Sequence, residues 1–316
     1  MAQTHSFKNR SFVHTGKPEW PTLGLFMGCY LLWAVSLGLF AVIGLWALPL
    51  TILTTAFHSS LQHEVLHGHP TRSPLLNELL ATPALGLWFP YRRYRALHLR
   101  HHINERLTDP LDDPESWYLP ASRWSELTGL QRRILQFNAT LSGRLLIGPA
   151  LSWAGFWREE IKLFKAQNPT VIRAWGLHCA GLIPVLVALA WADFPLWLYL
   201  LAVAYPATAI ILLRSFIEHR AAVRWQSRTA IVESGKLMSL LYLNNNLHAV
   251  HHDNPSLPWY QLPAQWEHQR NEVLANNGGY HIKGGYGEVF RRWFFQRREP
   301  IAHPYPDALI KRPPAG

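Results

Sequence analysis

Two long uncharged stretches dominate the pattern of hydrophobic and polar positions along this chain. The first extends from Pro21 to Phe57, about 37 residues without an Asp, Glu, Lys or Arg. A single helix needs roughly 20 apolar residues to cross a bilayer, so this stretch is long enough for two antiparallel helices. We predict spans at about residues 22–43 and 47–67, with a turn near Gly44 to Pro49.

The second stretch extends from Ala174 to Leu213 and is interrupted only by Asp193 and Pro195. These two residues are typical of a short turn. The turn divides the stretch into predicted spans at about residues 174–192 and 195–214. The chain is therefore expected to cross a membrane four times.

Polar and basic residues occupy the rest of the chain. We expect a polar N-terminal segment at residues 1–20, one domain at 21–263 whose water-facing parts are about 68–173 and 215–263, and a basic tail at 264–316. The two predicted hairpin turns contain no Lys or Arg, whereas the termini and the middle of the chain are rich in them. The positive-inside rule therefore places the termini and the water-facing parts in the cytoplasm.

Two further apolar segments are too short to span a bilayer. Residues 74–90 contain Pro83 and Pro90 and are expected to form an interfacial or re-entrant segment. Apolar side chains between residues 289 and 294 fall on one helical face beside several arginines. That pattern is typical either of a helix on an anionic lipid surface or of a surface helix packed on the domain.

The composition fits a protein that is part membrane-embedded and part water-exposed. Hydrophobic residues make up 49% of the 316 residues and charged residues only 16%. The formal net charge of +10 suits an anionic membrane surface, and nucleic acid is not an expected partner because no zinc-finger, RNP or helix-turn-helix pattern accompanies the basic residues. Only Cys29 and Cys179 are present, both in apolar runs, which excludes a disulfide framework or a zinc ribbon.

Histidine is the unusual residue type, with 17 copies, and its distribution matters more than its number. The clustered histidines are His63 and His67, then His98, His101 and His102, then His219, and finally His248, His251 and His252. Spacings of three and four place imidazoles on one helical face, and an adjacent histidine can turn in from the next position. Each cluster is expected to offer two or three ligands to one site, and the predicted spans bring all of them to the same side of the membrane.

The first cluster alone is compatible with three kinds of site. Residues 63–67 match the H-E-x-x-H of zinc proteases, residues 64–67 match the E-x-x-H of soluble di-iron bundles, and the two histidines alone fit a histidine-only centre. Zinc uses three or four ligands, which leaves the other clusters unexplained, and a soluble di-iron bundle needs a second E-x-x-H that this chain lacks. The nine clustered imidazoles suit two ions such as iron, so a di-iron centre is favoured.

With these clusters the chain resembles the membrane fatty acid desaturase superfamily, which also includes hydroxylases, ketolases and other oxygenases. The resemblance rests on the segments His63–Pro70, His98–His102 and His248–His252 and on the run Pro255–Pro263. It extends from the first predicted span to about Pro263. It implies an all-α fold, an integral membrane four-helix bundle with a cytoplasmic, helical, histidine-rich di-iron domain.

The resemblance also implies an enzyme that uses O2 and external electrons to desaturate an aliphatic chain in a fatty acyl or lipid substrate. The cofactor would be two iron ions, and the ligands carried over are His63, His67, His98, His101, His102, His219, His248, His251 and His252. Hydrogen bonds that orient the imidazoles are expected from neighbouring polar side chains. The candidates are Glu64, His69, Asp109, Asp113 and Asn245.

Alternatives remain within and outside this class of enzyme. The first histidine cluster has three residues between His63 and His67, one fewer than the corresponding motif of many acyl desaturases. This spacing leaves room for a hydroxylase or other oxygenase acting on a lipid or small hydrophobic substrate. A more distant alternative is an intramembrane zinc protease with Glu64 as general base. The chain lacks haem-attachment, iron–sulfur and G-x-G-x-x-G patterns, so a separate ferredoxin or cytochrome with its reductase is expected to supply electrons.

Overall fold

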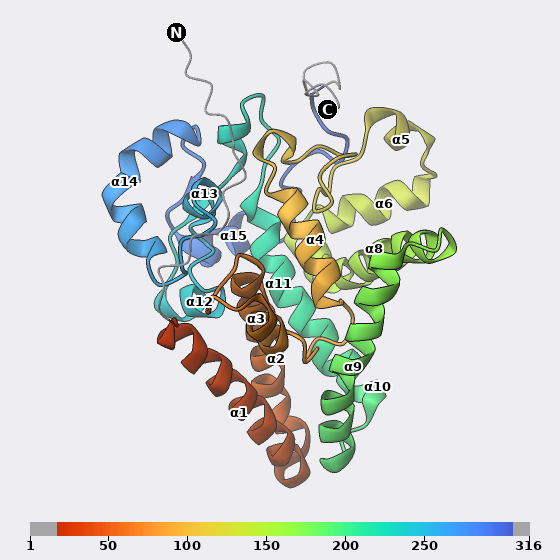
Figure 1. The fold of residues 1–316 in the computed structure, drawn as a ribbon. Helices are drawn as coiled ribbons and strands as arrows, with labels where there is room; N and C mark the ends of the chain where they lie inside the picture. Colours follow the sequence, from red (N-terminus) through yellow and green to blue (C-terminus); the bar gives the residue numbers. More distant parts are fainter. Residues whose placement is uncertain (1–17, 306–316) are drawn as a thin grey trace.

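The computed structural model describes residues 18–305, which are mostly helical (Figure 1). The predicted polar segment at residues 1–20 therefore lies almost entirely outside the described part of the chain. Three helical stretches are long and apolar enough to cross a membrane, namely Trp20–Leu66, Pro169–Trp191 and Leu196–Glu218. The predicted helical architecture is confirmed, with one short pair of strands as an addition.

The first of these stretches, 47 residues long, folds back on itself. It consists of α1 (Trp20–Ile43), the 3-10 turn η1 (Gly44–Ala47) and α2 (Leu48–Leu66), and α1 packs against α2. Gly44 has φ +58°, a left-handed conformation that glycine adopts at no steric cost, and the chain reverses direction there. The helix pair and its turn lie where the sequence predicted them.

The second and third stretches also form a hairpin. α9 (Pro169–Trp191) is followed by a turn at Asp193, then α10 (Leu196–Tyr199), the π-helical turn η3 (Leu200–Ala204) and α11 (Tyr205–Glu218). In Figure 1 the turns of both hairpins lie together at the lower end of the molecule.

Both helices of the second hairpin extend further than the predicted spans at their polar ends. α9 starts earlier because the Asn168 side chain caps it by accepting hydrogen bonds from the backbone N–H groups of Thr170 and Val171. α11 continues past Arg214 because Arg214 forms a buried ion pair at 2.9 Å with Glu218, one turn later. Opposite charges at this spacing support a helix, so these charged residues do not end it.

The hydroxyl group of Tyr199 connects the two hairpins. Trp33 of α1 donates its Nε1–H to this oxygen at 2.9 Å, and the hydroxyl donates to the backbone carbonyl of Leu85, also at 2.9 Å. Buried apolar residues around it include Leu37 and Val185. A buried tyrosine hydroxyl needs such partners, and here they fix the loop around Leu85 against both hairpins.

The segment predicted to be interfacial or re-entrant contains α3 (Pro74–Ala81) and an irregular loop that ends at Pro90. The loop lies directly against α9. A Cβ atom on Gly181 would be 2.3 Å from the carbonyl oxygen of Thr82, so only glycine permits this approach. The loop then leads into the helix that carries the second histidine cluster.

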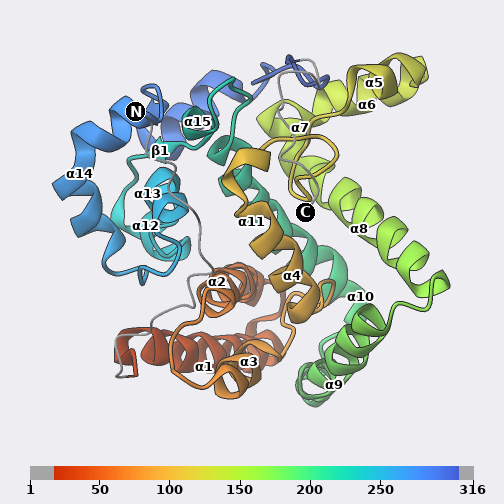
Figure 2. The ribbon, with the colours of Figure 1, turned by 45° about the horizontal axis from the view of Figure 1, so that its top comes forward.

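The polar part of the chain lies at the opposite end of the hairpins from their turns (Figure 1). Its helices are α4 (Tyr91–His101), η2 (Asn104–Arg106), α5 (Ala121–Glu126), α6 (Gly129–Asn138), α7 (Leu141–Leu146), α8 (Gly148–Lys165), η4 (Trp225–Arg228), α12 (Lys236–Leu241), α13 (His248–Asp253), α14 (Leu262–Asn276) and α15 (Gly285–Trp293). Strands β1 (Ile231–Val232) and β2 (His281–Ile282) pair in parallel. Figure 2 shows α2, α4 and α11 in the middle of the molecule, with α12, α13, α14 and α15 on one side and α5–α8 on the other.

Residues 264–305, which the prediction assigns to a basic tail, contain most of α14 and all of β2 and α15. The predicted boundary between domain and tail falls inside α14, and β2 pairs with β1 from before the third histidine cluster. Val289 of α15 is fully buried in a cluster with Tyr242 and Tyr286. Of the two interpretations of residues 289–294, the helix packed on the domain therefore accounts for Val289. Pairing between distant segments leaves no mark on the hydropathy pattern, which is why the sequence suggested a separate tail.

Candidate metal centre

α2 carries the first histidine pair to the polar end of the first hairpin. His63 lies in its last turn, and His67 follows its last residue. Being four positions apart, the two imidazoles share one side of the helix, and their ring centroids are 4.9 Å apart. Both side chains are buried.

α4 carries the second histidine cluster, and its side chains point in two different directions. The Nε2 atom of His98 lies 3.0 Å from that of His102, on the side that faces α2. His101 points elsewhere, and its Nε2 atom lies 2.9 Å from Nε2 of His219. His219 follows the end of α11 in an extended conformation, fixed by an antiparallel bridge to Thr229.

The third cluster, on the six-residue helix α13, is divided in the same way. The Nε2 atom of His251 lies 3.2 Å from that of His102, whereas Nε2 of His248 lies 3.0 Å from that of His219. The ring of His252 stacks on that of His102, with centroids 4.2 Å apart. α13 therefore completes both halves of the site.

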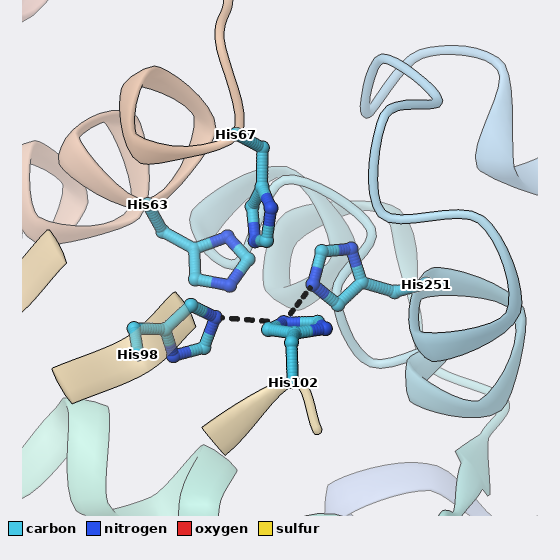
Figure 3. A group of neighbouring side chains, drawn as sticks. All are labelled: His63, His67, His98, His102 and His251. Atoms are coloured by element: carbon cyan, nitrogen blue, oxygen red, sulfur yellow. Dashed lines mark hydrogen bonds between the residues drawn. The ribbon is translucent and has the colours of Figure 1, made fainter. Parts of the chain in front are cut away.

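All nine predicted histidines come together, in two adjoining groups. The first, shown in Figure 3, contains His63, His67, His98, His102 and His251, and the second contains His101, His219, His248 and His252. Within each group the candidate ligand atoms lie within 4.8 Å of one another. In Figure 3 rings from α2, α4 and α13 point towards a common centre. Each group could hold a metal ion.

The histidines of α4 and those of α13 are each divided between the two groups. His101 and His102 are neighbours in the sequence but belong to different groups, and so do His251 and His252. Successive positions on an α-helix are about 100° apart, so adjacent side chains diverge. Both helices therefore contribute to each group.

The hydrogen bonds of the outer ring nitrogens show that the two groups suit a cation. The Nδ1 atom of His98 faces a Glu115 oxygen at 2.7 Å, and that of His101 faces an Asp113 oxygen at 2.8 Å. The Nδ1 atom of His248 faces the amide oxygen of Asn245 at 3.0 Å, and that of His252 faces the amide oxygen of Asn104 at 3.1 Å. A neutral imidazole that donates from Nδ1 has only a lone pair at Nε2. The inner Nε2 atoms of neutral His98, His248 and His252 are therefore acceptors, and that of His252 has no hydrogen-bond partner among the described residues. A metal ion would satisfy them.

The protonation of most of these imidazoles also suits metal binding. Burial and the neighbouring histidines lower the pKa values of His102, His251 and His252 well below the ordinary value. These three rings are therefore neutral near pH 7, the form that binds metals. His101 differs. Burial disfavours its charged form, but the carboxylates of Glu115 and Asp113 outweigh this and raise its pKa to about 9.

Comparison with known proteins identifies the family to which the chain belongs. Residues 33–284, most of its length, match the profile of the fatty acid desaturase family. The chain belongs to the fatty acid desaturase family. It is also similar to the chloroplastic omega-6 fatty acid desaturase of Arabidopsis thaliana, with 23% identity over 282 residues. That match covers 82% of this chain and 58% of the relative, so the chain spans little more than half of that protein. Family membership and the three apolar helical stretches identify a membrane protein.

In this desaturase-family chain, two of the five residues predicted to orient imidazoles do contact the histidine groups. The Asp113 carboxylate faces Nδ1 of His101, and the Asn245 amide oxygen faces Nδ1 of His248. The prediction does not hold for Asp109, whose carboxylate accepts hydrogen bonds from the backbone of residues 111 and 112 and caps a turn. A short polar side chain at a turn commonly bonds to the local backbone in this way.

Glu64 and His69 lie in a separate buried cluster. One Glu64 oxygen accepts a hydrogen bond from the backbone N–H of Trp259 at 2.8 Å, and the other lies 3.9 Å from Nε2 of His69. His69 in turn pairs with Glu19 at the start of α1, at 2.6 Å. The predicted role in orienting ligands is therefore replaced by contacts that join the first histidine pair to α1 and to the segment after α13.

Sequence reasoning missed three residues that contact the imidazoles. Glu115 faces His98, Asn104 faces His252, and the carboxylate of Glu218 lies 3.3 Å from Nδ1 of His248. Glu115 had a signal, because it stands in the same acidic turn as Asp113. Glu218 directly precedes His219, but no pattern distinguishes Asn104.

Replacing Asp113 with asparagine is expected to weaken metal binding by the second histidine group about 10- to 100-fold. The change removes the negative charge that holds the Nδ1 proton of His101 and leaves the size of the side chain unchanged. Metal retention during titration with a chelator measures the effect. Asp112→Asn is the matched control, because Asp112 is the neighbouring carboxylate and pairs with Arg100 at the surface. Equal retention in the two variants would contradict the role of Asp113.

Proposed function

We propose that this protein is an integral-membrane oxidoreductase that uses O2 and electrons from a partner to desaturate an aliphatic chain in a fatty acyl or lipid substrate. The observation that carries the proposal is the pair of adjoining, mostly buried, all-histidine groups at the polar end of the apolar hairpins. A substrate dissolved in the bilayer would find its reaction site at the ends of the helices that cross it. Membership of the fatty acid desaturase family supports the same chemistry.

The metal that the two groups suit best is iron, one ion in each. Nine nitrogen donors exceed the three or four of a tetrahedral zinc site, and imidazole is a good ligand for iron. When bound, a pair of iron ions supplies the activation of O2 that breaks an aliphatic C–H bond. Histidine is the only residue type in either group, which argues against the soluble di-iron arrangement with its carboxylate ligands.

The chain's own residues have two tasks in this proposal. Glu115, Asn245 and Asn104 hold the Nδ1 protons of His98, His248 and His252 and so keep each Nε2 lone pair directed inwards. Asp113 holds the Nδ1 proton of His101. Seven of the nine histidines are buried, and His102 and His219 are half-buried, which limits the access of water to the reacting atoms.

The proposed topology has four membrane crossings. α1 and α2 are 24 and 19 residues long, each close to the roughly 20 residues that cross a bilayer, and the second hairpin adds two more. The hairpin turns contain no Lys or Arg, so the polar end with the histidines and both termini would be cytoplasmic.

A hydroxylase or other oxygenase is the second candidate, because the same metal site could insert oxygen after breaking the C–H bond. The short spacing between His63 and His67, with three residues between them, supports this candidate. The zinc-protease alternative requires Glu64 to face a metal-bound water. Its carboxylate is instead engaged by the backbone of Trp259.

The reaction product distinguishes desaturation from hydroxylation. Iron-loaded protein in lipid nanodiscs is supplied with O2, a ferredoxin and its reductase, and the lipids are analysed by mass spectrometry. We expect O2-dependent loss of two hydrogens from an aliphatic chain, whereas gain of one oxygen would favour the hydroxylase. The same reaction with NAD(P)H alone is expected to fail because the electron donor is a separate protein. An iron-loaded protein that changes no lipid in either way would contradict the proposal.

A further inference from the structure

A cavity of about 80 Å³ lies beside the second histidine group. His219 and Glu218 form part of its wall, together with the loop at residues 108–118, the end of α6, Arg144 of α7 and residues 298–301. Nothing in the proposed redox chemistry uses this space. Its unusual feature is a pair of arginines, Arg144 and Arg298.

Arg144 is buried, with 5% of its surface exposed. Its Nε–H donates to the backbone carbonyl of Asn138 at 3.3 Å, but Nη1 is buried without a hydrogen-bond partner among the described residues. The guanidinium lies 3.6 Å from the ring centroid of Trp117. α7 approaches α6 closely enough to place it there because residue 143 is glycine. A Cβ at that position would lie 1.8 Å from the carbonyl oxygen of Phe137.

The charge of Arg144 has no counter-ion in the described part of the chain, where no carboxylate comes within ion-pair distance of it. Arg298 is near instead, and the two guanidinium groups lie 5.6 and 5.5 Å from the same Phe216 ring. Burial and the charge of Arg298 lower the pKa of Arg144 to about 9. Stacking on Trp117 offsets only part of the cost of a buried charge, because buried charges are normally paired.

The acidic residues in the cavity wall do not supply the missing counter-ion, because each is engaged elsewhere. Asp113 faces His101, Glu115 faces His98, and Glu218 pairs with Arg214. The fourth is Glu299, which lies 3.5 Å from Nη2 of Arg298. Burial raises the pKa of its carboxyl group to about 8. Arg144 is therefore the arginine of the cavity wall that no carboxylate among the described residues pairs with.

We propose that this cavity binds a carboxylate group, the acid end of an aliphatic substrate, through Arg144, whereas Arg298 is held by Tyr280 and the backbone carbonyl of His219. A guanidinium fork matches the two oxygens of a carboxylate, and Leu135 and Ile301 line the same cavity with apolar surface. The volume holds a carboxylate and a few carbons or several waters, and it is too small for a nucleotide-bearing acyl carrier. A free small carboxylate has the same chemistry and is distinguished below.

The assignment of the ligand as a substrate rests on the proposed function, whereas the carboxylate site does not. Binding to Arg144 requires neither metal nor electrons. A protein that binds the acid but never oxidises it would leave the site intact, and a protein that oxidises only esters and binds no acid would overturn the site alone.

Calorimetry on the full chain in lipid nanodiscs, without an electron donor, tests the proposal. We expect hexanoate to bind, and the uncharged isostere hexanamide to bind at least about tenfold more weakly, because a charged guanidinium pairs far better with a carboxylate. Arg144→Gln is expected to lower hexanoate affinity at least about tenfold. Arg133→Gln, which removes an exposed arginine from α6, is the matched control and should bind as the unaltered protein does.

Equal binding of hexanoate and hexanamide would overturn the proposal, and this comparison needs no variant that has to fold. Unchanged hexanoate affinity in Arg144→Gln would overturn it as well. Acetate identifies the source of the ligand. Binding much weaker than that of hexanoate assigns the site to the acid end of a chain, and equal binding assigns it to a free small carboxylate. Both results support a carboxylate site.

Discussion

Replacing His251 with alanine is expected to remove the metal from the first histidine group and to lower turnover more than about 100-fold. Loss of a residue that only orients a ligand costs about 10- to 100-fold, and loss of a ligand exceeds that. The candidate ligand atom of His251 lies within 4.8 Å of the other four in its group, and its Nε2 atom lies 3.2 Å from that of His102. His101→Ala is expected to do the same to the second group. Iron content per chain and product formation measure both effects.

The matched control is His268→Ala, which removes an exposed histidine from α14. It should keep full iron content and full turnover. Two results would count against the metal centre. One is unchanged iron content and turnover in both His251→Ala and His101→Ala, and the other is the loss of activity to a similar degree in the control.

Replacing Arg214 with methionine is expected to lower the free energy of unfolding by about 3–5 kcal/mol. Arg214 and Glu218 are both buried and pair at 2.9 Å, so the change leaves the carboxylate of Glu218 buried without its cation. Because Glu218 also lies 3.3 Å from Nδ1 of His248, the second histidine group should lose order with it. Denaturant unfolding in mixed micelles measures the stability.

A second change separates loss of the pair from loss of packing. Arg214→Met combined with Glu218→Gln, which removes the stranded charge, is expected to recover about half of the lost stability. Arg173→Met, an exposed arginine on α9, serves as the control and should stay within about 0.5 kcal/mol of the unaltered protein. If Arg214→Met behaves like this control, the buried pair does not stabilise the fold.

The sequence predicted the helical pairs and the nine clustered histidines because both depend on local spacing. The turn at Gly44 and the spacing of His63 and His67 are properties of a few neighbouring residues, and helix geometry converts them directly into positions. The ends of the spans were less accurate, since the Asn168 cap and the pairing of Arg214 with Glu218 depend on side-chain contacts that hydropathy does not record.

The partners of the imidazoles could be predicted only in part. Asp113 and Glu115 stand in one acidic turn with Asp109, but only the fold of that turn decides which carboxylates point towards the histidines and which cap the backbone. Asn104 and Glu218 reach the groups from separate elements. The buried position of Arg144 is similarly a result of packing, because its neighbours Trp117 and Phe216 are distant from it in the sequence.

The sequence by itself determined that this chain has long apolar helices and nine histidines at helical spacings, because hydropathy and periodicity are read along the chain. Only the tertiary structure decided how the histidines divide. His101 and His102, like His251 and His252, point to different groups, and that depends on how α4 and α13 are oriented relative to α2 and α11. It also decided that residues 264–305 complete the domain and that two arginines share a cavity beside the histidines, because both arise from contacts between segments far apart in the chain.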